Sequence, residues 1–159
     1  MHRNRLPAEP QNWKALQSHP YKQEFTNAAK EEWQAVKNMG TIQLIPRAHA
    51  TSKPLPLTWV FKYKFDKHGF LAKFKARICV RGDQQPLSDK ETYAATLAGK
   101  SFRILIALAA RWDLTLRQLD AVNAFQNSPL DEVVFVELPD GFKETGQVAR
   151  LLKALYGLR

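Results

Sequence analysis

The stretch TWVFKYKFDKHGFLAKFKARICVR, residues 58–81, decides the fold, because its residues alternate in character on both sides of a short turn. In the first half, the aromatic positions are Trp59, Phe61, Tyr63 and Phe65, with Lys62 and Lys64 between them. A period of two is typical of a half-buried β-strand. Lys67-His68-Gly69 supplies a turn whose glycine accepts a positive φ. The stretch therefore predicts a β-hairpin over residues 58–81.

The two faces of this hairpin are expected to differ in character, because the alternation resumes after the turn. On the return strand the apolar positions are Ala72, Phe74, Ala76, Ile78 and Val80, and the basic ones are Lys73, Lys75, Arg77 and Arg81. Residues 53–81 hold eight Lys or Arg and one Asp, which is seven of the nine net positive charges. This concentration favours a phosphate-bearing or nucleic-acid partner over a solvated surface without a partner.

The composition of the whole chain is that of one globular domain. The chain has 159 residues, of which 45% are hydrophobic and 25% charged, and its net charge is +9. Nucleic acid is the first partner class that this charge suggests, and an anionic membrane is the second. No apolar run approaches the length of a membrane span, and the single cysteine, Cys79, lies in an apolar run as a small hydrophobe. We expect a cytoplasmic or nuclear protein that is neither secreted nor bound to a membrane.

The segments around the hairpin predict an α+β domain with mostly antiparallel strands and packed helices. Apolar residues recur at three- and four-residue spacing in the predicted helices, and prolines interrupt the rest. In chain order we expect a loose leader at 1–20, a helix at 21–38, a short extended piece at 42–45, the hairpin, a buried helix at 101–111 capped by Ser101, a strand at 114–122, a turn at Pro129, a strand at 133–138, and a helix at 147–156 that stops at Gly157.

Asp120 is the candidate metal ligand, because it ends an apolar run just before a turn. A carboxylate in that position can reach a hard cation such as Mg²⁺, although single carboxylates at strand ends are common. Asp131 and Glu132 follow Pro129 and are expected in a turn. The four histidines lack metal-ligand spacing, and the chain has neither a glycine-rich phosphate loop nor a Ser-His-Asp pattern.

Five stretches are similar, in order, to the motifs of one enzyme family. Trp59-Val60-Phe61-Lys62 through Gly69 is similar to "WVFK-x-K-x-D-x-x-G", Lys75 through Gln85 to "KARLVARG", Phe102 through Ala110 to "IR-x-LLALAA", Gln118 through Phe125 to "Q-x-DV-x-x-AF", and Leu155 through Arg159 to the start of "LYGLKQ". These motifs belong to the reverse transcriptase domain of copia-type retrotransposons. The chain resembles an amino-terminal fragment of that domain, with Glu32 of the first helix in its lead-in.

The resemblance implies an RNA-directed DNA polymerase, which is a nucleotidyltransferase. The fold would be an incomplete right hand over residues 21–159, with fingers at 58–81 and the start of the palm at 114–159. The implied ligands are an RNA or DNA primer–template, dNTPs and Mg²⁺, and the implied partner is the remainder of a polyprotein that also serves DNA integration.

The resemblance also gives roles to single residues. Fingers cations are implied to contact the incoming triphosphate and the template, and the candidates are Lys62, Lys64, Lys75 and Arg77. Asp120 is implied to be the first catalytic aspartate and a metal ligand, together with the backbone carbonyl of Ala121. Phe125 is implied to be the steric gate that excludes a ribose 2′-hydroxyl.

The chain departs from the family pattern after Asp120. Ala121, Gln126 and Ser128 replace the commoner Val, an apolar residue and Gly. The family's Tyr-x-Asp-Asp motif, with its two further metal-binding carboxylates, is absent from these 159 residues. We therefore expect a truncated domain that is inactive alone. The alternatives are a non-catalytic nucleic-acid-binding remnant that uses the basic hairpin, and an inert remnant.

Overall fold

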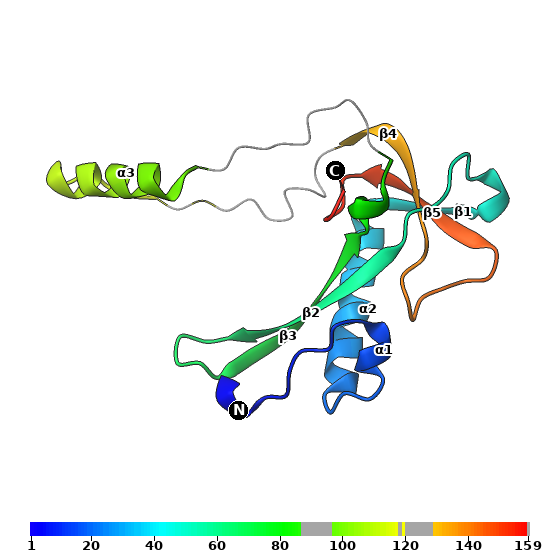
Figure 1. Cartoon of the computed structure of the whole chain (residues 1–159), viewed down its shortest axis with the longest axis horizontal. Helices are drawn as coiled ribbons and strands as arrows, with labels where there is room; N and C mark the ends of the chain where they lie inside the picture. The colour runs from blue at the N-terminus through cyan, green and yellow to red at the C-terminus, as the bar shows by residue number, and fades with distance from the viewer. Residues whose placement is uncertain (87–96, 118, 120–128, 159) are drawn as a thin grey trace. The chain divides into compact units, whose positions relative to one another are not determined.

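The computed structural model describes residues 1–86, 97–117, 119 and 129–158. The chain divides into two compact units, one formed by Met1–Pro86 with Asn123–Arg159 and the other by Leu87–Val122. The first unit contains a long helix, α2 (Lys22–Asn38), and two antiparallel sheets, and the second contains the helix α3 (Gly99–Arg111) (Figure 1). The predicted α+β class with antiparallel strands is confirmed.

The predicted hairpin is present as β2 (Leu57–Phe65) and β3 (Leu71–Val80), which pair with each other in a two-stranded sheet. We call it the arm. Its register places Trp59 opposite Ile78 and Phe61 opposite Ala76, so these side chains share one face. Trp59 and Phe61 are each 3% exposed, so the aromatic face is part of the core.

Helix α2 begins one residue later than predicted and packs along the arm beside β3 (Figure 1). The apolar positions that predicted this helix are all buried: Phe25, Ala28, Ala29, Trp33 and Val36. Phe25 lies at the centre of an aromatic cluster, with its ring 5.4 Å from that of Phe61, 5.2 Å from Tyr63 and 5.0 Å from Phe74. The long amphipathic pattern therefore marked both the helix and the face that it buries.

The second sheet has three strands in the order β1 (Ile42–Pro46), β5 (Gln147–Lys153), β4 (Pro129–Val136). Leu55, just before the arm, makes a parallel bridge to Val136 of β4. Its backbone N–H donates to the Phe135 carbonyl at 2.8 Å, and its carbonyl accepts from the Glu137 N–H at 2.9 Å. The base of the arm is thereby joined to the three-stranded sheet.

The prediction of a helix at 147–156 was wrong, because this stretch forms the central strand β5. Val148, Leu151 and Leu155 fit a helical face, but Val148, Ala149 and Leu151 are buried between β1 and β4 as strand residues. Gly157 is not a helix stop. It has φ +88°, and a Cβ there would lie 2.2 Å from the Val80 carbonyl oxygen, so glycine lets the two backbones approach.

The prediction of a loose leader at residues 1–20 was also wrong. Leu16 in the short helix α1 (Trp13–Leu16) is fully buried, and the Trp13 ring lies 5.9 Å from that of Trp59. Gly141 approaches so closely that a Cβ there would lie 2.1 Å from Trp13. At the tip of the arm, the Arg3 N–H donates to the Gly69 carbonyl at 3.0 Å. The prolines restrict the backbone of residues 1–20 but do not prevent this segment from packing against the core.

Three smaller predictions also fail. Helix α3 forms, but Ala98 occupies its N-cap in place of Ser101. Residues 114–117 are not in a strand, and the rest of the strand predicted at 114–122 lies mainly outside the described residues. Strand β4 includes Pro129, Asp131 and Glu132, which were expected in a turn.

Among the described residues, no helix combines the length and apolar character needed to cross a membrane.

Candidate nucleic-acid interface

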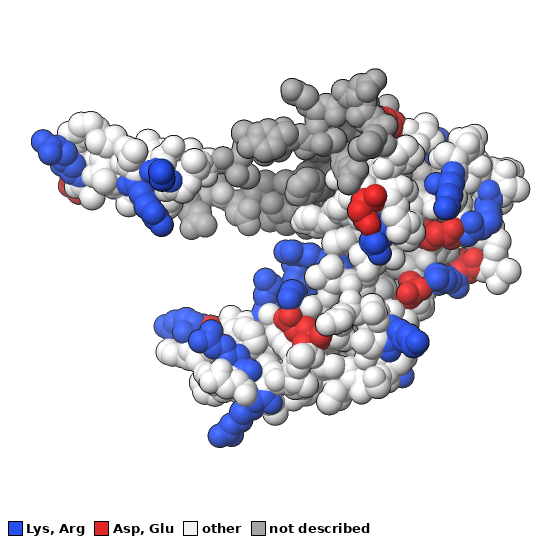
Figure 2. All heavy atoms as spheres, in the orientation of Figure 1, with Lys and Arg blue, Asp and Glu red and all other residues white. Residues whose placement is uncertain are grey.

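The cations of the arm lie on the face opposite its aromatic side chains. The strand register pairs Lys62 with Lys75, Lys64 with Lys73, and Val60 with Arg77. Because side chains directly opposite each other in an antiparallel pair lie on the same face, the register brings these five cations together. Figure 2 shows Lys and Arg side chains along the arm, with few acidic groups between them. The predicted clustering of Lys62, Lys64, Lys75 and Arg77 is therefore present.

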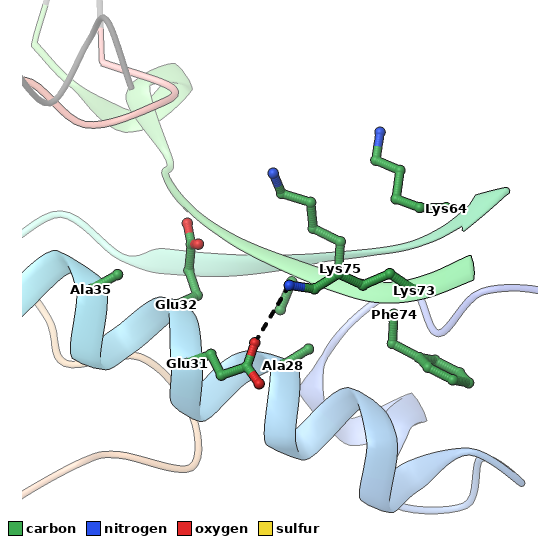
Figure 3. Close-up of a pocket in the computed structure, with 9 residues that line it drawn as sticks. Ala28, Glu31, Glu32, Ala35, Lys64, Lys73, Phe74 and Lys75 are labelled. Atoms are coloured by element: carbon green, nitrogen blue, oxygen red, sulfur yellow. Dashed lines mark ion pairs between the residues drawn. The ribbon is translucent and has the colours of Figure 1, made fainter. Parts of the chain in front are cut away.

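The cations in the middle of the arm differ in how far they are already engaged. Lys64 and Lys75 extend from the same side of the hairpin, whereas Lys73 reaches toward Glu31 of α2 (Figure 3). The Lys73–Glu31 pair is 3.7 Å long, and both side chains are about two-thirds exposed, so it holds Lys73 weakly. Within the described part of the chain, the ammonium groups of Lys64 and Lys75 make no ion pair.

Arg77 lies near the base of the arm, where its guanidinium group lies over the Tyr156 ring in a cation–π contact, 5.5 Å from the ring centroid. The Tyr156 carbonyl accepts a hydrogen bond of 2.6 Å from the Val80 N–H, which fixes this segment against β3. A cation–π contact leaves guanidinium N–H groups able to donate to a phosphate. Arg77 thus remains a candidate phosphate contact with its orientation restricted.

Glu32 of α2 balances part of this charge. It lines an open groove between α2 and β3 with Lys64, Lys73 and Lys75 (Figure 3). Burial raises the pKa of the Glu32 carboxyl, while Lys75, Arg77 and the backbone N–H of Ile78 act in the opposite direction. Sequence reasoning placed Glu32 in a family motif without a role. Its position beside Lys75 and Arg77 follows only from the packing of α2 on β3.

Lys62 is held by a residue that the sequence did not suggest. Its ammonium group donates to Glu9 Oε2 at 2.6 Å, and the backbone N–H of Tyr63 donates to Glu9 Oε1 at 2.9 Å. Glu9 and Lys62 are 53 residues apart in the chain, so no local pattern reveals the pair. Lys62 thus differs from Lys64 and Lys75, the neighbouring predicted phosphate contacts, because its ammonium group is held by a carboxylate.

The predicted metal site falls outside the described residues, as Asp120, Ala121 and Phe125 all do. In the part of the chain that the structure describes, no group of three or more His, Cys, Asp or Glu side chains could hold a metal ion. Cys79 is half-buried, and burial raises the pKa of its thiol, which agrees with a packing role.

Comparison with known proteins gives one consistent result. The profile of the family described as "Reverse transcriptase (RNA-dependent DNA polymerase)" matches residues 40–159. The chain is 35% identical over 156 residues to the retrovirus-related Pol polyprotein from transposon TNT 1-94 of Nicotiana tabacum, covering 95% of this chain and 12% of the relative. It is 34% identical over 124 residues to that from transposon RE2 of Arabidopsis thaliana, covering 75% of this chain and 8% of the relative.

A third relative agrees with these two. The Pol polyprotein from transposon RE1 of Arabidopsis thaliana is 32% identical over 140 residues, which is 85% of this chain and 10% of the relative. The chain thus spans about a tenth of the length of the curated relatives that it matches. No solved structure matches it.

Proposed function

The chain belongs to the reverse transcriptase family of copia-type retrotransposon Pol polyproteins, and from this premise we propose that its arm contacts phosphates during RNA-directed DNA synthesis. The ligands are the incoming dNTP and an RNA or DNA primer–template. The arm serves as the fingers of a right-hand polymerase fold within residues 21–159, whose palm begins near residue 114. The observation that carries this proposal is the shared face of Lys62, Lys64, Lys73, Lys75 and Arg77 on two paired strands.

The chemistry of this face suits a polymerase. Lysine and arginine contacts to phosphate oxygens carry no sequence information, so they serve any template equally well. A hairpin whose other face is buried in an aromatic core also holds its cations on a fixed backbone. The cost of ordering the side chains on binding is therefore lower than on a flexible loop. These features support contacts to a sugar–phosphate backbone rather than to bases.

We further assign Asp120 as the catalytic carboxylate and the ligand of Mg²⁺, with the backbone carbonyl of Ala121 beside it and Phe125 as the gate against ribonucleotides. These roles rest on the family motif at residues 118–125. When bound, the metal ions would supply stabilisation of charge on the transferring phosphoryl group. The remainder of a Pol polyprotein is the proposed partner, and the cytoplasm or nucleus the proposed location.

DNA synthesis on a primed RNA template tests this proposal. The chain would be assayed with Mg²⁺ as it stands and after joining it to a polymerase segment that carries a Tyr-x-Asp-Asp motif. We expect synthesis only in the joined protein, and loss of that synthesis in its Asp120→Asn variant. Synthesis that survives Asp120→Asn would contradict the assignment of Asp120.

The competing function is a nucleic-acid binder without catalysis, which the same basic face also favours. The two functions differ in the role of Asp120, because a binder does not need that carboxylate. Lys75→Gln is expected to weaken nucleic-acid binding in either case, since it removes a cation from the arm. A joined protein that binds RNA in a Lys75-dependent way but never synthesises DNA would favour the binder.

A further inference from the structure

Glu9 forms an ion pair with Lys62, one of the cations of the arm. Its two carboxylate oxygens accept from the Lys62 ammonium group at 2.6 Å and from the Tyr63 backbone N–H at 2.9 Å. The Glu9 side chain is 27% exposed, whereas that of Lys62 is 59% exposed. The acid is therefore the more deeply held partner, and the lysine reaches to it from the surface.

The segment that carries Glu9 is fixed on both sides. Pro10 is buried, and the His19 ring lies with its Nε2 atom 3.0 Å from the Ala8 carbonyl oxygen. Farther along the arm, the Leu71 N–H donates to the Met1 carbonyl at 2.9 Å. Glu9 is thus delivered to the arm by a docked backbone. This distinguishes it from Glu31, whose pair with Lys73 is 3.7 Å long between two largely exposed side chains.

The two oxygens of Glu9 take hydrogen bonds that a phosphate would also take. A phosphate on this face would accept from lysine ammonium groups and from backbone N–H groups, and Glu9 already accepts one of each. An anion arriving from solution must therefore compete for Lys62 with a hydrogen-bonded carboxylate, which occupies one of the three ammonium N–H donors and offsets its charge. Lys64 and Lys75 impose no such requirement within the described part of the chain.

We propose that Glu9 is an internal competitor of phosphate that withholds Lys62 from a bound polyanion, so that the arm engages its ligand through Lys64, Lys75 and Arg77. Glu9 acts through Lys62 and is a positioning residue. The inference rests on the proposed function, because it needs the basic face to bind a polyanion. It departs from the sequence prediction, which treated Lys62 as equivalent to the other three.

The test is a double-mutant cycle on the full chain, with binding to a single-stranded RNA oligonucleotide measured over a range of salt concentrations. Each phosphate contact contributes roughly 0.7 to the slope of log affinity against log salt for a single strand, which is about five-fold in affinity at about 0.1 M salt. Glu9→Gln keeps an oxygen for the Tyr63 N–H but removes the charge that holds Lys62. Glu144→Gln, in an exposed loop outside the arm, is the control with the same change in net charge.

We expect Glu9→Gln to strengthen binding about five-fold and to steepen the slope by roughly 0.7 more than Glu144→Gln does. Lys62→Gln is expected to change affinity less than about two-fold in the wild-type chain but about five-fold in the Glu9→Gln background. A five-fold loss from Lys62→Gln in the wild-type chain would overturn the proposal. The measurement on Lys62→Gln in the wild-type chain does not depend on how the Glu9 variant folds.

The failure of this inference can be told from the failure of the proposed function. If Lys64→Gln and Lys75→Gln weaken binding while the effects of Glu9→Gln and Lys62→Gln simply add, the basic face binds polyanions and only the role of Glu9 is wrong. If neither Lys64→Gln nor Lys75→Gln changes the affinity or the slope, the proposed phosphate surface itself is wrong, and the inference falls with it.

Discussion

Single aromatic side chains hold the arm to the rest of its unit. Phe25 of α2 is fully buried and contacts rings from both strands of the arm, including Phe61 of β2 and Phe74 of β3. Aromatic rings at these distances bury much apolar area and add favourable edge-to-face contacts. The position of the basic face therefore depends on residues that never meet a ligand.

Phe25→Ala is expected to lower the free energy of unfolding by about 3–5 kcal/mol, because it leaves a cavity among rings that cannot all move to fill it. Urea unfolding followed by circular dichroism measures the loss. Phe70→Ala is the control, since Phe70 is 51% exposed at the tip of the arm, and its cost is expected to stay below about 1 kcal/mol. Equal losses in the two variants would contradict the packing described for α2.

Tyr63 should titrate later than an ordinary tyrosine. Burial raises its pKa to about 12, and Tyr21, Glu9 and Glu24 act in the same direction. Because the folded state favours the protonated phenol, its contribution to stability is present below the unfolded pKa of about 10 and is lost as the pH rises through about 12.

Tyrosinate absorbance between pH 9 and 13 measures this titration. We expect a late component, which Tyr63→Phe removes. Folded protein that lacks a late component would show that Tyr63 is not held as described.

Among the elements, the amino-terminal segment shows most clearly what periodicity misses. Residues 1–20 contain three prolines and no regular pattern, so they were predicted to be loose. Their order comes from contacts with partners far away in the sequence, among them those of Glu9, Trp13 and Leu16. Contacts of this kind depend on where the arm lies, which a local pattern does not contain.

Leu16→Ala tests whether this segment is part of the folded unit. Leu16 is fully buried, so its truncation is expected to cost about 2–5 kcal/mol of unfolding free energy. Leu44→Ala, at a position in β1 that is 39% exposed, should cost about 1 kcal/mol or less. A loose leader would instead make Leu16→Ala the milder change of the two, as judged by thermal or urea unfolding.

Strand β5 shows the opposite kind of error, in which a pattern was present but ambiguous. Val148, Leu151, Leu152 and Leu155 suit one face of a helix, yet a short apolar run also suits a strand with neighbours on both sides. The arm was predictable because its alternation continues through both strands, and α2 because its pattern spans more than four turns. The length of the pattern thus separated the arm and α2, which were predicted correctly, from β5, which was not.

At the scale of the whole molecule, the sequence located the basic surface but not its internal balance. Alternation alone predicted that Lys62, Lys64, Lys75 and Arg77 share a face, and the strand register confirms it. Glu9 and Glu32 offset part of the positive charge of this face. They come from separate segments of the chain and reach the face only when those segments pack against the arm. The roles of Asp120, Ala121 and Phe125 stay predictions, because they lie outside the described residues.

The measurement that tests the central claim most directly is the salt dependence of nucleic-acid binding by the chain and its arm variants. Affinity for an RNA–DNA hybrid would be measured from about 50 to 200 mM salt for the wild-type chain and for Lys64→Gln/Lys75→Gln/Arg77→Gln, with Lys30→Gln/Lys37→Gln/Lys143→Gln as a control of equal charge away from the arm. We expect the arm variant to lose about 100-fold in affinity and to flatten the slope by two to three, since each phosphate contact contributes roughly 0.7–0.9. Equal losses in the two triple variants would contradict the claim that the arm is the nucleic-acid interface.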